Sequence, residues 1–438
     1  MTPYRILIVE DLKEWLDMFR LVAARETAAN FDFRENVESA KKALAARPVH
    51  VASLDQNLPL LAGEMAADRY GFELLEEIVK ERPLVRTLMY TKFGATFFGN
   101  RAGRLGGTEY FEKQQASDET NGIDVIDYVK LMGILISGGK RRDGTVERGY
   151  VHWALGRSRD QLPGMIGVQA GRLHDAWMGS FDSDKASKAL SLLIERVAEL
   201  AWAHASALAL HCKVKPLGVR YAPADLAALI SDLESQFIVL GRDNHLGGWR
   251  GYITESDVSG GWGQPGGRLV RALNRLRNVR NRDAHGAIEA LSPLDLHDVS
   301  SDLLAVIDAL AAWADRPLMY GTRNHPDDRS RLQYQKLVGT TSWPIADILS
   351  EALPLKTADR RVSIQFLHRS DGKDQLIDMF PFASMVERAG KPPVPALLLP
   401  KPRGYVRRSL ISGEIIEGVP VTPTEQRAFA AFGLNQTR

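Results

Sequence analysis

The sequence of 438 residues predicts a multidomain protein: a doubly wound α/β domain with a five-stranded parallel sheet, then an all-α helical bundle, then a small mainly β module. Three observations support this prediction. Short apolar runs alternate with helical patterns at the beginning of the chain. Apolar positions recur at helical spacing from about residue 185 to 320. Strand-like runs punctuated by Gly and Pro follow from about residue 330.

The composition is ordinary for a globular protein, with 45% hydrophobic and 25% charged residues. The single cysteine, Cys212, excludes an internal disulfide framework, a four-cysteine zinc site and a CxxC redox pair. No apolar run reaches the roughly 20 residues that span a bilayer, and no export signal is visible, so we expect a cytoplasmic protein without a membrane partner. Because the net charge is only +2, any contact with nucleic acid has to be local.

The expected domain boundaries follow from these patterns. A Gly- and Arg-rich stretch at 137–150 indicates a linker. The chain is therefore expected to divide into the α/β domain (1–137), a linker with an unassigned helical segment (138–184), the helical bundle (185–322) and the C-terminal β-rich module (323–438).

Four predicted strands of the α/β domain end in polar residues. Glu10 and Asp11 follow the first strand, Asp55 follows the second, Thr91 ends the third and Lys113 ends the fourth. Helical patterns between the strands predict a parallel sheet, whose carboxyl ends share one edge and carry the site. Three carboxylates at that edge would repel one another unless a hard cation lay among them. A lysine and a hydroxyl there would complete a site for a phosphoryl group.

This order of motifs resembles the receiver domain of two-component response regulators, over about 130 residues. The acidic pair is followed by Asp-x-x-Leu-Pro from Asp55 to Pro59, by GFELLEEI from Gly71, and by the threonine and the lysine. The resemblance implies that a sensor histidine kinase or another phosphodonor phosphorylates Asp55. It also implies that Mg²⁺ is held by Glu10, Asp11, Asp55 and the carbonyl of Asn57, that phosphoryl oxygens are bound by Thr91 and Lys113, and that Tyr110 turns inward on activation.

The chain departs from the receiver pattern at three places. The segment 60–70 (LLAGEMAADRY) inserts extra residues beside the site, Lys92 stands where a small residue is usual, and Gln114 stands where proline is usual. These departures concern the kinetics of phosphorylation and the phosphodonor rather than the fold. The alternative is a degenerate receiver used only for docking.

The segment 268–286 is predicted to be one helix of about five turns, because glycines precede and end it. At a period of 3.6 residues, Leu269, Leu273 and Leu276 form one apolar stripe. Arg280 falls on the same stripe. An arginine at the end of an apolar stripe is costly unless it is paired or used.

Asn281 and His285 are four residues apart, so they share a helix face and can form a hydrogen bond. The set Arg280-Asn281-x-x-x-His285 at a helix end within a bundle resembles the HEPN superfamily, many of whose members are metal-independent ribonucleases that act as dimers. The resemblance implies that Arg280 holds the scissile phosphate of RNA and that His285 moves a proton between the ribose 2′-hydroxyl and the leaving oxygen. Asn281 would orient His285, and this domain would need no cofactor.

Two functions remain open for the helical bundle. One is a phosphorylation-controlled endoribonuclease; the other is a non-catalytic adaptor that dimerises or binds a partner protein. In the second case Arg280 pairs with an acid such as Asp283 or Glu289, and His285 caps the helix. A homodimer is expected in either case, because the leucine stripe and the Ala/Leu-rich helix at 189–210 offer more apolar surface than a small bundle needs. The absence of a recognisable helix-turn-helix makes a transcription factor the third choice.

The C-terminal module is predicted to contain two hairpins. VSIQFLH and QLIDMFPF flank a turn at SDGK, and YVRRSLISGEIIEGV turns at SGE. The basic stretch at 401–408 (KPRGYVRR) is either a solvated strand face or a contact for nucleic acid. The last residues, TPTEQRAFAAFGLNQTR, are expected to fray.

Overall fold

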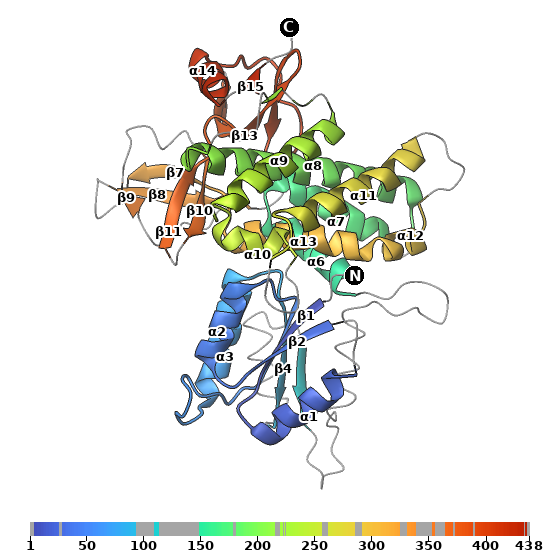
Figure 1. Ribbon diagram of the computed structural model, residues 1–438, viewed down its shortest axis with the longest axis vertical. Coiled ribbons are helices and arrows are strands. Elements are labelled where there is room, and N and C mark those ends of the chain that lie inside the picture. The colour runs from blue at the N-terminus through green and yellow to red at the C-terminus, as the bar shows by residue number, and fades with distance from the viewer. Residues whose placement is uncertain are drawn as a thin grey trace. The chain divides into compact units, whose positions relative to one another are not determined.

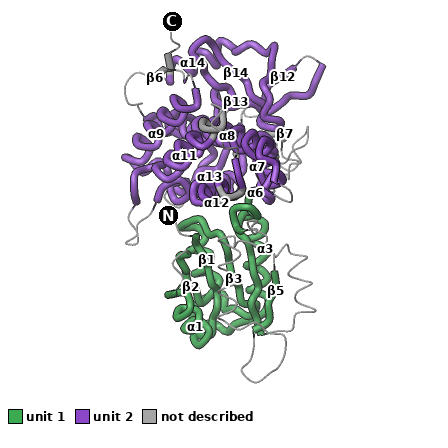
Figure 2. Tube along the Cα trace, turned by 90° about the vertical axis from the view of Figure 1, so that its right-hand side faces the viewer, with its two compact units in different colours: residues 1–154 green, residues 155–438 purple. Residues whose placement is uncertain are grey.

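The computed structural model divides into two compact units, residues 1–154 (the first unit) and residues 155–438 (the second unit), shown in Figure 2. Each unit is considered by itself. The structure describes residues 4–25, 29–92, 109–113, 149–177, 181–214, 220–221, 223, 225–255, 262–284, 291–324, 331–338, 353–354, 364–370, 373–388, 390–432 and 434–435.

The first unit contains a five-stranded parallel sheet with the strand order β2-β1-β3-β4-β5. This is the doubly wound flavodoxin-like order, which CheY also has. The first unit therefore has a receiver-like fold, as the sequence predicts, and the four predicted strands with polar ends are confirmed. The strands are β1 (Tyr4–Val9), β2 (Ala29–Arg34), β3 (Val51–Leu54), β4 (Arg86–Thr91) and β5 (Glu109–Glu112).

Helices cover both faces of this sheet (Figure 1): α2 (Val37–Ala46) and α3 (Asp68–Glu81) lie on one face, and α1 (Lys13–Ala23) lies on the other. Alternation along the strands places one set of apolar side chains in a buried cluster with α2 and α3. The side chain of Asn36 accepts a hydrogen bond from the backbone N–H of Ser39 and so begins α2. Burial on both faces explains why β1, β3 and β4, which lie inside the sheet, read as mainly apolar runs.

The inserted segment 60–70 is fastened to α2 through the residues at its beginning. The carbonyl of Pro59 accepts a hydrogen bond from the backbone N–H of Val37 (3.1 Å), and that of Leu60 accepts one from Glu38 (3.2 Å). These bonds satisfy N–H groups that the first turn of a helix leaves without an intrahelical partner. The insertion therefore stabilises the start of α2 close to the loop that follows β3.

The second unit is built around a helical bundle, and α8 forms its centre with an almost entirely buried second half. The segment 138–184, which the sequence analysis leaves unassigned, contributes α6, whose first residues belong to the first unit, and α7. Among the described helices of the protein, none is both long enough and apolar enough to cross a membrane. The helices are α6 (Tyr150–Gln161), α7 (Gly164–Trp177), α8 (Ser183–His211), α9 (Leu226–Arg242), the 3-10 helix η1 (Gly247–Trp249), α10 (Arg250–Ile253), α11 (Gly267–Ala284), α12 (Pro293–Asp298) and α13 (Ser300–Asp315).

Helix α11 confirms the five-turn helix predicted from the sequence, with 18 residues. The three leucines of its stripe, Leu269, Leu273 and Leu276, are fully buried. α11 packs against α13, α8 and α9 within the unit. The stripe is therefore covered by the chain itself and does not supply a free apolar face for a second copy.

Two antiparallel sheets, a short parallel strand pair and a short helix complete the described part of the second unit. One sheet has the order β11-β10-β7-β8-β9, another the order β12-β13-β14, and β6 pairs with β15. The elements are β6 (Arg220–Tyr221), β7 (Met319–Asn324), β8 (Arg331–Lys336), β9 (Leu353–Pro354), β10 (Ile364–Ser370), β11 (Lys373–Asp378), β12 (Ala383–Arg388), β13 (Lys391–Lys401), β14 (Gly404–Ser409), α14 (Pro423–Ala431) and β15 (Leu434–Asn435).

The first predicted hairpin is confirmed as β10 and β11, but the second is largely wrong. β14 pairs mainly with β13, and the chain that returns after Gly413 forms only the isolated bridge between Arg408 and Ile415. The expectation that the last residues fray is also wrong for α14. Thr422 and Glu425 form a capping box that begins this helix.

Candidate functional site

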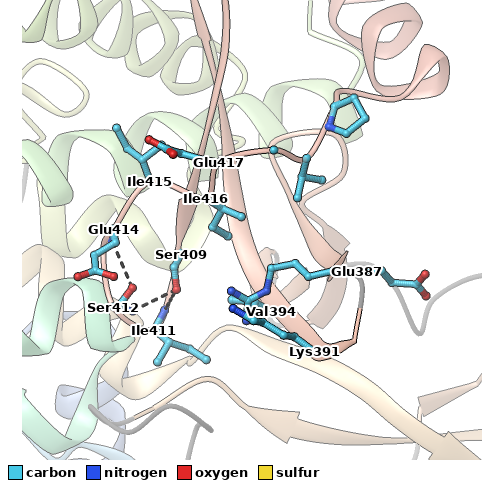
Figure 3. Close-up of a pocket in the computed structure, with 14 residues that line it drawn as sticks. Glu387, Lys391, Val394, Ser409, Ile411, Ser412, Glu414, Ile415, Ile416 and Glu417 are labelled. Carbon is cyan, nitrogen blue, oxygen red and sulfur yellow. Dashed lines mark hydrogen bonds between the residues drawn. The ribbon is translucent and has the colours of Figure 1, made fainter.

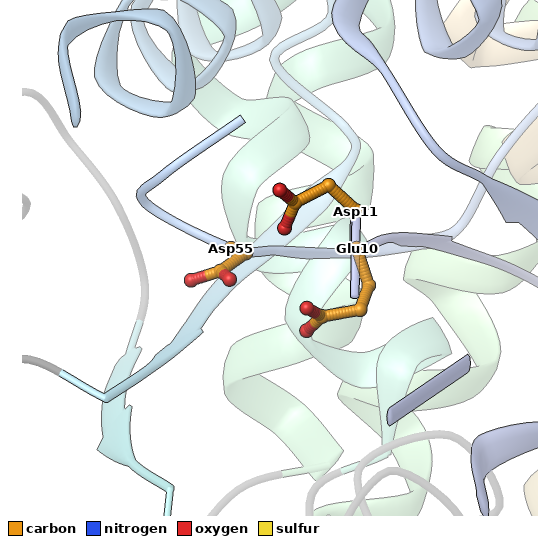
Figure 4. A group of neighbouring side chains, drawn as sticks. All are labelled: Glu10, Asp11 and Asp55. Carbon is orange, nitrogen blue, oxygen red and sulfur yellow. The ribbon is translucent and has the colours of Figure 1, made fainter. Parts of the chain in front are cut away.

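Three carboxylates meet at the carboxyl edge of the first sheet, as the sequence predicts. Glu10 and Asp11 follow β1, and Asp55 follows β3, the strand beside it. One ligand oxygen from each side chain lies within 4.8 Å of the others, and Figure 4 shows the three carboxylates gathered at one place. Glu10 and Asp55 are buried and Asp11 is half-buried. The parallel sheet therefore brings together acids that are far apart in the sequence.

Lys113 follows β5 and contributes one positive charge to this acidic cluster. Its ammonium group donates hydrogen bonds to Glu10 Oε2 and, at 2.9 Å, to Asp55 Oδ2. The Lys113 side chain is fully buried. One cation faces three carboxylates, so the cluster keeps an excess of negative charge.

The unbalanced charge appears in the titration of the acids. Burial, with the neighbouring Asp55 carboxylate, raises the pKa of Glu10 to about 8. The same two causes, in the same order, raise the pKa of Asp11. A divalent cation would lower both values by stabilising the ionised carboxylates. Three convergent carboxylate oxygens are also the donor set that Mg²⁺ prefers, so the residues present fit such an ion.

Thr91, the last residue of β4, provides a hydroxyl with an unused hydrogen-bonding capacity. The residue is fully buried, and its Oγ1 atom has no hydrogen-bond partner among the described residues. Its carbonyl accepts a hydrogen bond of 2.7 Å from the backbone N–H of Lys113. A buried hydroxyl without a partner costs about 1–3 kcal/mol, so its presence beside the acids indicates a place for an oxygen atom of a ligand.

Helix α3 approaches the backbone of Asp55 and Gln56 so closely that only glycine fits at its fourth residue, Gly71. A Cβ atom built on Gly71 would lie 2.3 Å from the carbonyl oxygen of Gln56 and 2.4 Å from that of Asp55. The backbone N–H of Gly71 donates a hydrogen bond of 3.2 Å to that Gln56 carbonyl. The GFELLEEI motif thus fixes the loop that carries the Asp55 carboxylate.

Gln56 links Asp55 to Tyr110 through two hydrogen bonds. The backbone N–H of Gln56 donates a 2.7 Å hydrogen bond to Asp55 Oδ1, and its side-chain Oε1 accepts one of 3.5 Å from the Tyr110 hydroxyl. Gln56 is fully buried. Burial and nearby carboxylates, Glu112 first, raise the pKa of Tyr110 above its ordinary value. The predicted switch tyrosine is therefore neutral and lies next to the residue that follows Asp55.

Asn57 and Lys92, two further residues singled out in the sequence, lie close to residues of the site along the chain. Asn57 lies half-buried in the turn after β3, two residues from Asp55. Lys92 is exposed directly after Thr91. Gln114 lies outside the described residues.

Two aromatic residues beside Lys113 are absent from the sequence prediction. Its Nζ atom lies 5.2 Å from the ring centroid of Trp15, in the first turn of α1, and 5.7 Å from that of Tyr90, in β4. The only signal in the sequence was that Trp15 stands four residues after Asp11 and that Tyr90 directly precedes Thr91. Their meeting depends on how α1 packs on the sheet, which spacing alone does not give.

In the second unit, the predicted motif falls at the end of α11. Arg280 and Asn281 belong to the last turns of this helix, but their side chains lie outside the described part of the structure, and so does all of His285. The suggested partners, the side chain of Asp283 and the whole of Glu289, also lie outside it. The geometry of this cluster therefore stays a prediction.

Three basic residues in the first half of α11 are paired with acids. Arg268 forms a buried ion pair with Asp308 of α13. Arg275 pairs with Asp302 of α13 at 2.7 Å, and Arg271 pairs with Glu255. All three cations are matched within the unit, so this part of the helix holds the bundle together.

A separate pocket lies between the β12–β13 turn and the segment that follows β14, as Figure 3 shows. Its volume is about 560 Å³. The hydroxyl of Ser409 accepts hydrogen bonds from the backbone N–H groups of Ile411 and Ser412, and that of Ser412 accepts one from Glu414. These hydroxyls are engaged in shaping the loop. The charged residues that line the pocket are of both signs: Glu387, Arg388, Lys391, Glu414 and Glu417.

Comparison with known proteins finds similarity to solved receiver domains. A CheY-like response regulator receiver domain protein from Methanospirillum hungatei shares 21% identity, over 30% of this chain and 92% of that chain, with a TM-score of 0.25. The Mn²⁺-bound form of response regulator Rcp1 shares 20% identity, over 30% and 93%, with a TM-score of 0.25. The signal receiver domain of a putative Luxo repressor protein from Vibrio parahaemolyticus shares 19%, over 30% and 88%, with a TM-score of 0.25. No family model and no curated protein matches the chain.

Proposed function

We propose that the protein is a response-regulator-like signalling protein in which phosphorylation of Asp55, in the presence of Mg²⁺, controls the second unit. One observation carries this proposal: the buried hydroxyl of Thr91, which has no hydrogen-bond partner in the described part of the chain, lies at the same sheet edge as Asp55 and Lys113. A metal-binding cluster alone would not need that hydroxyl. A phosphoryl group on Asp55 offers three oxygens, which Thr91 and Lys113 can bind.

In the proposed reaction, an Asp55 carboxylate oxygen attacks the phosphorus atom of a phosphohistidine or of a small acyl phosphate. A new O–P bond forms, the bond from phosphorus to the donor breaks, and the electron pair leaves with the donor. Lys113 has to transfer a hydrogen bond from Asp55 to a phosphoryl oxygen, and Thr91 donates its hydroxyl hydrogen to another. Glu10, Asp11 and Asp55 would hold Mg²⁺, which would neutralise charge on the transferring group.

The roles of Asn57 and Tyr110 belong to the same proposal. Asn57 would contribute its backbone carbonyl to the Mg²⁺ site. Tyr110 would leave its contact with Gln56 and turn inward when Thr91 moves toward the phosphoryl group. Beryllofluoride, which mimics the phosphoryl group, is therefore expected to shift the NMR signals of Tyr110 and Lys113, and unchanged signals at saturating beryllofluoride and Mg²⁺ would contradict this role.

Labelling with acetyl phosphate tests the proposal. The full-length protein is incubated with acetyl phosphate and Mg²⁺, and the phosphorylated fraction is measured on a phosphate-affinity gel. We expect labelling of the wild type, none of Asp55→Asn, and none after chelation of Mg²⁺. Equal labelling of wild type and Asp55→Asn would show that the acceptor is misassigned. A wild type that does not label would support a degenerate docking receiver.

For the second unit, we propose that the HEPN-like motif of Arg280, Asn281 and His285 makes it the effector. The motif's place at the end of a helix that is packed inside a bundle supports a HEPN-like reading. The pairing of Arg268, Arg271 and Arg275 with acids favours the non-catalytic adaptor over the endoribonuclease, because it removes free positive charge from the helix that would bind RNA.

A cleavage assay separates these two effectors. The wild type and His285→Ala are incubated with total RNA, with and without acetyl phosphate and Mg²⁺. If the second unit is a ribonuclease, the wild type cleaves RNA and His285→Ala does not. A substrate without the 2′-hydroxyl is then not cleaved, because the ribose supplies the attacking group. Absence of cleavage in every arm favours the adaptor. Light scattering on the same samples tests for a homodimer, which would have to use a surface other than the leucine stripe of α11, because that stripe is buried within the unit.

A further inference from the structure

We propose that Trp15 and Tyr90 form an aromatic box that positions the ammonium group of Lys113 and shields it from water. Trp15 and Tyr90 are thus positioning residues for the site. The inference concerns the apo geometry of Lys113 itself, and its consequence for phosphorylation rests on the proposed function.

The box has two walls that support each other. The rings of Trp15 and Tyr90 meet edge to face, with 5.9 Å between centroids and 82° between planes. Phe19, one turn further along α1, packs on Tyr90 in the same way at 5.8 Å. Tyr90 and Phe19 are both about 1% exposed. The walls are therefore held by the packing of α1 on the sheet rather than by Lys113.

The ammonium group lies where both rings attract a cation. Its Nζ atom is 5.2 Å from the Trp15 centroid and 5.7 Å from the Tyr90 centroid, within the roughly 6 Å over which the ring quadrupole acts. The Lys113 side chain is fully buried, and cation–π attraction is stronger for a desolvated cation. Glu10 and Asp55 take hydrogen bonds from the same ammonium group.

The aromatic box can hold Lys113 in place when its hydrogen bonds to the carboxylates are released. When Asp55 accepts a phosphoryl group and Glu10 binds a cation, Lys113 has to release at least one of its two carboxylate contacts. The aromatic box does not change in that step, so it keeps the ammonium aimed at the edge of the sheet. Trp15 is only half-buried, so its ring forms the wall between Lys113 and solvent.

Chemical labelling of Lys113 tests the box directly. Full-length wild type, Trp15→Phe and Trp15→Leu are treated with acetic anhydride, and acetylation of Lys113 is followed by mass spectrometry, with the exposed Lys42 as internal reference. We expect Lys113 to react about ten-fold faster in Trp15→Leu than in wild type, and Trp15→Phe to stay close to wild type because it keeps a ring. An unchanged Lys113 rate in Trp15→Leu, relative to Lys42, would overturn the box.

Phosphorylation by acetyl phosphate gives the functional arm. Trp15→Leu is expected to phosphorylate about ten-fold more slowly than wild type, with rescue in Trp15→Phe. Equal rates in all three proteins, with wild type active, would overturn the positioning role while leaving the proposed function intact. If the wild type itself is not phosphorylated, the proposed function fails, and the acetylation of Lys113 still decides whether the box exists.

Discussion

Charged residues gather at two places, the carboxyl edge of the first sheet and the first half of α11. The two regions balance their charge in different ways. At the sheet edge, three carboxylates share one lysine, and Thr91 keeps a buried hydroxyl without a partner in the described structure. Along α11, Arg268, Arg271 and Arg275 each have their own acid. The sequence predicted a functional site at the sheet edge, whereas in α11 it pointed to the end of the helix and not to these three arginines.

Charge balance and hydrogen-bond satisfaction distinguish a ligand site from a structural network of ion pairs. Unbalanced charge and an unused buried hydroxyl are costly to fold, so they indicate that a ligand completes the site. In matched pairs the charge is balanced without a ligand, and removing one partner then affects folding. This contrast leads to four predictions, ordered by the size of the expected effect.

The buried pair of Arg268 and Asp308 should be the most sensitive point of α11. Arg268→Met leaves the Asp308 carboxylate buried without its cation, which should lower the free energy of unfolding by about 3–5 kcal/mol. Urea unfolding followed by circular dichroism measures this change. Phosphorylation of Asp55 by acetyl phosphate should continue at a normal rate below the unfolding transition, and its loss there would break the separation between the two regions.

The second unit should lose stability in mild acid. Burial lowers the pKa of His368 to about 4 in the folded protein, and burial also lowers that of His204. An unfolded histidine has a pKa near 6.5, so the unfolded state takes up protons first as the pH falls. The stabilisation is complete above about pH 6.5 and decreases toward pH 4, by on the order of 3 kcal/mol for His368.

The measurement is urea unfolding between pH 7.5 and pH 4, with the tryptophan fluorescence of the second unit as the probe. His368→Phe should flatten the pH dependence, although it can also lower the overall stability. A wild type whose stability does not change over this range would contradict the burial of these histidines as uncharged groups.

Gly71 should be the sensitive point of the sheet edge. Gly71→Ala places a methyl group against the carbonyls of Asp55 and Gln56, so either α3 or the loop that follows β3 has to move. Overpacking of this kind costs about 1–3 kcal/mol. Here the stability loss should come with slower phosphorylation, measured by the acetyl phosphate assay. A variant with normal rates would show that the loop tolerates displacement.

The exposed pair of Arg271 and Glu255 should contribute least. Both side chains are about half exposed, and such pairs are worth about 0–1 kcal/mol. Arg271→Met therefore serves as the matched control for Arg268→Met. If the two variants were destabilised equally, burial would not be what distinguishes the pairs along α11.

The sequence was sufficient for the framework of the first unit. The three strands β1, β3 and β4, which lead to Glu10, Asp55 and Thr91, are largely buried on both faces, so their apolar runs and polar ends are visible without tertiary information. The aromatic box was not visible, because Trp15 and Tyr90 come from a helix and a strand that meet only through packing. Helical periodicity marks a residue as facing the sheet but does not name its neighbour.

The second unit was harder to predict for a different reason. β13 begins with KPPVP, and the prolines argue against a paired strand. Pro392 and Pro393 are tolerated because they lie at an irregularity in the pairing of β13 with β12 and precede the pairing with β14, which starts at Ala396. The helix α14, in contrast, has a signal in the sequence. Thr422 and Glu425 have the spacing of a capping box, which predicts the start of a helix rather than a frayed end.

The central claim is that Asp55 is a phosphoacceptor that depends on a divalent cation, and trapping the acyl phosphate tests it most directly. The full-length protein is treated with acetyl phosphate and Mg²⁺ and then reduced with borohydride, which converts a phosphorylated aspartate into homoserine. Peptide mass spectrometry then locates the homoserine. The account predicts conversion at Asp55, dependent on Mg²⁺ and absent without acetyl phosphate. Conversion at another acidic residue, or at Asp55 with undiminished yield after chelation, would contradict it.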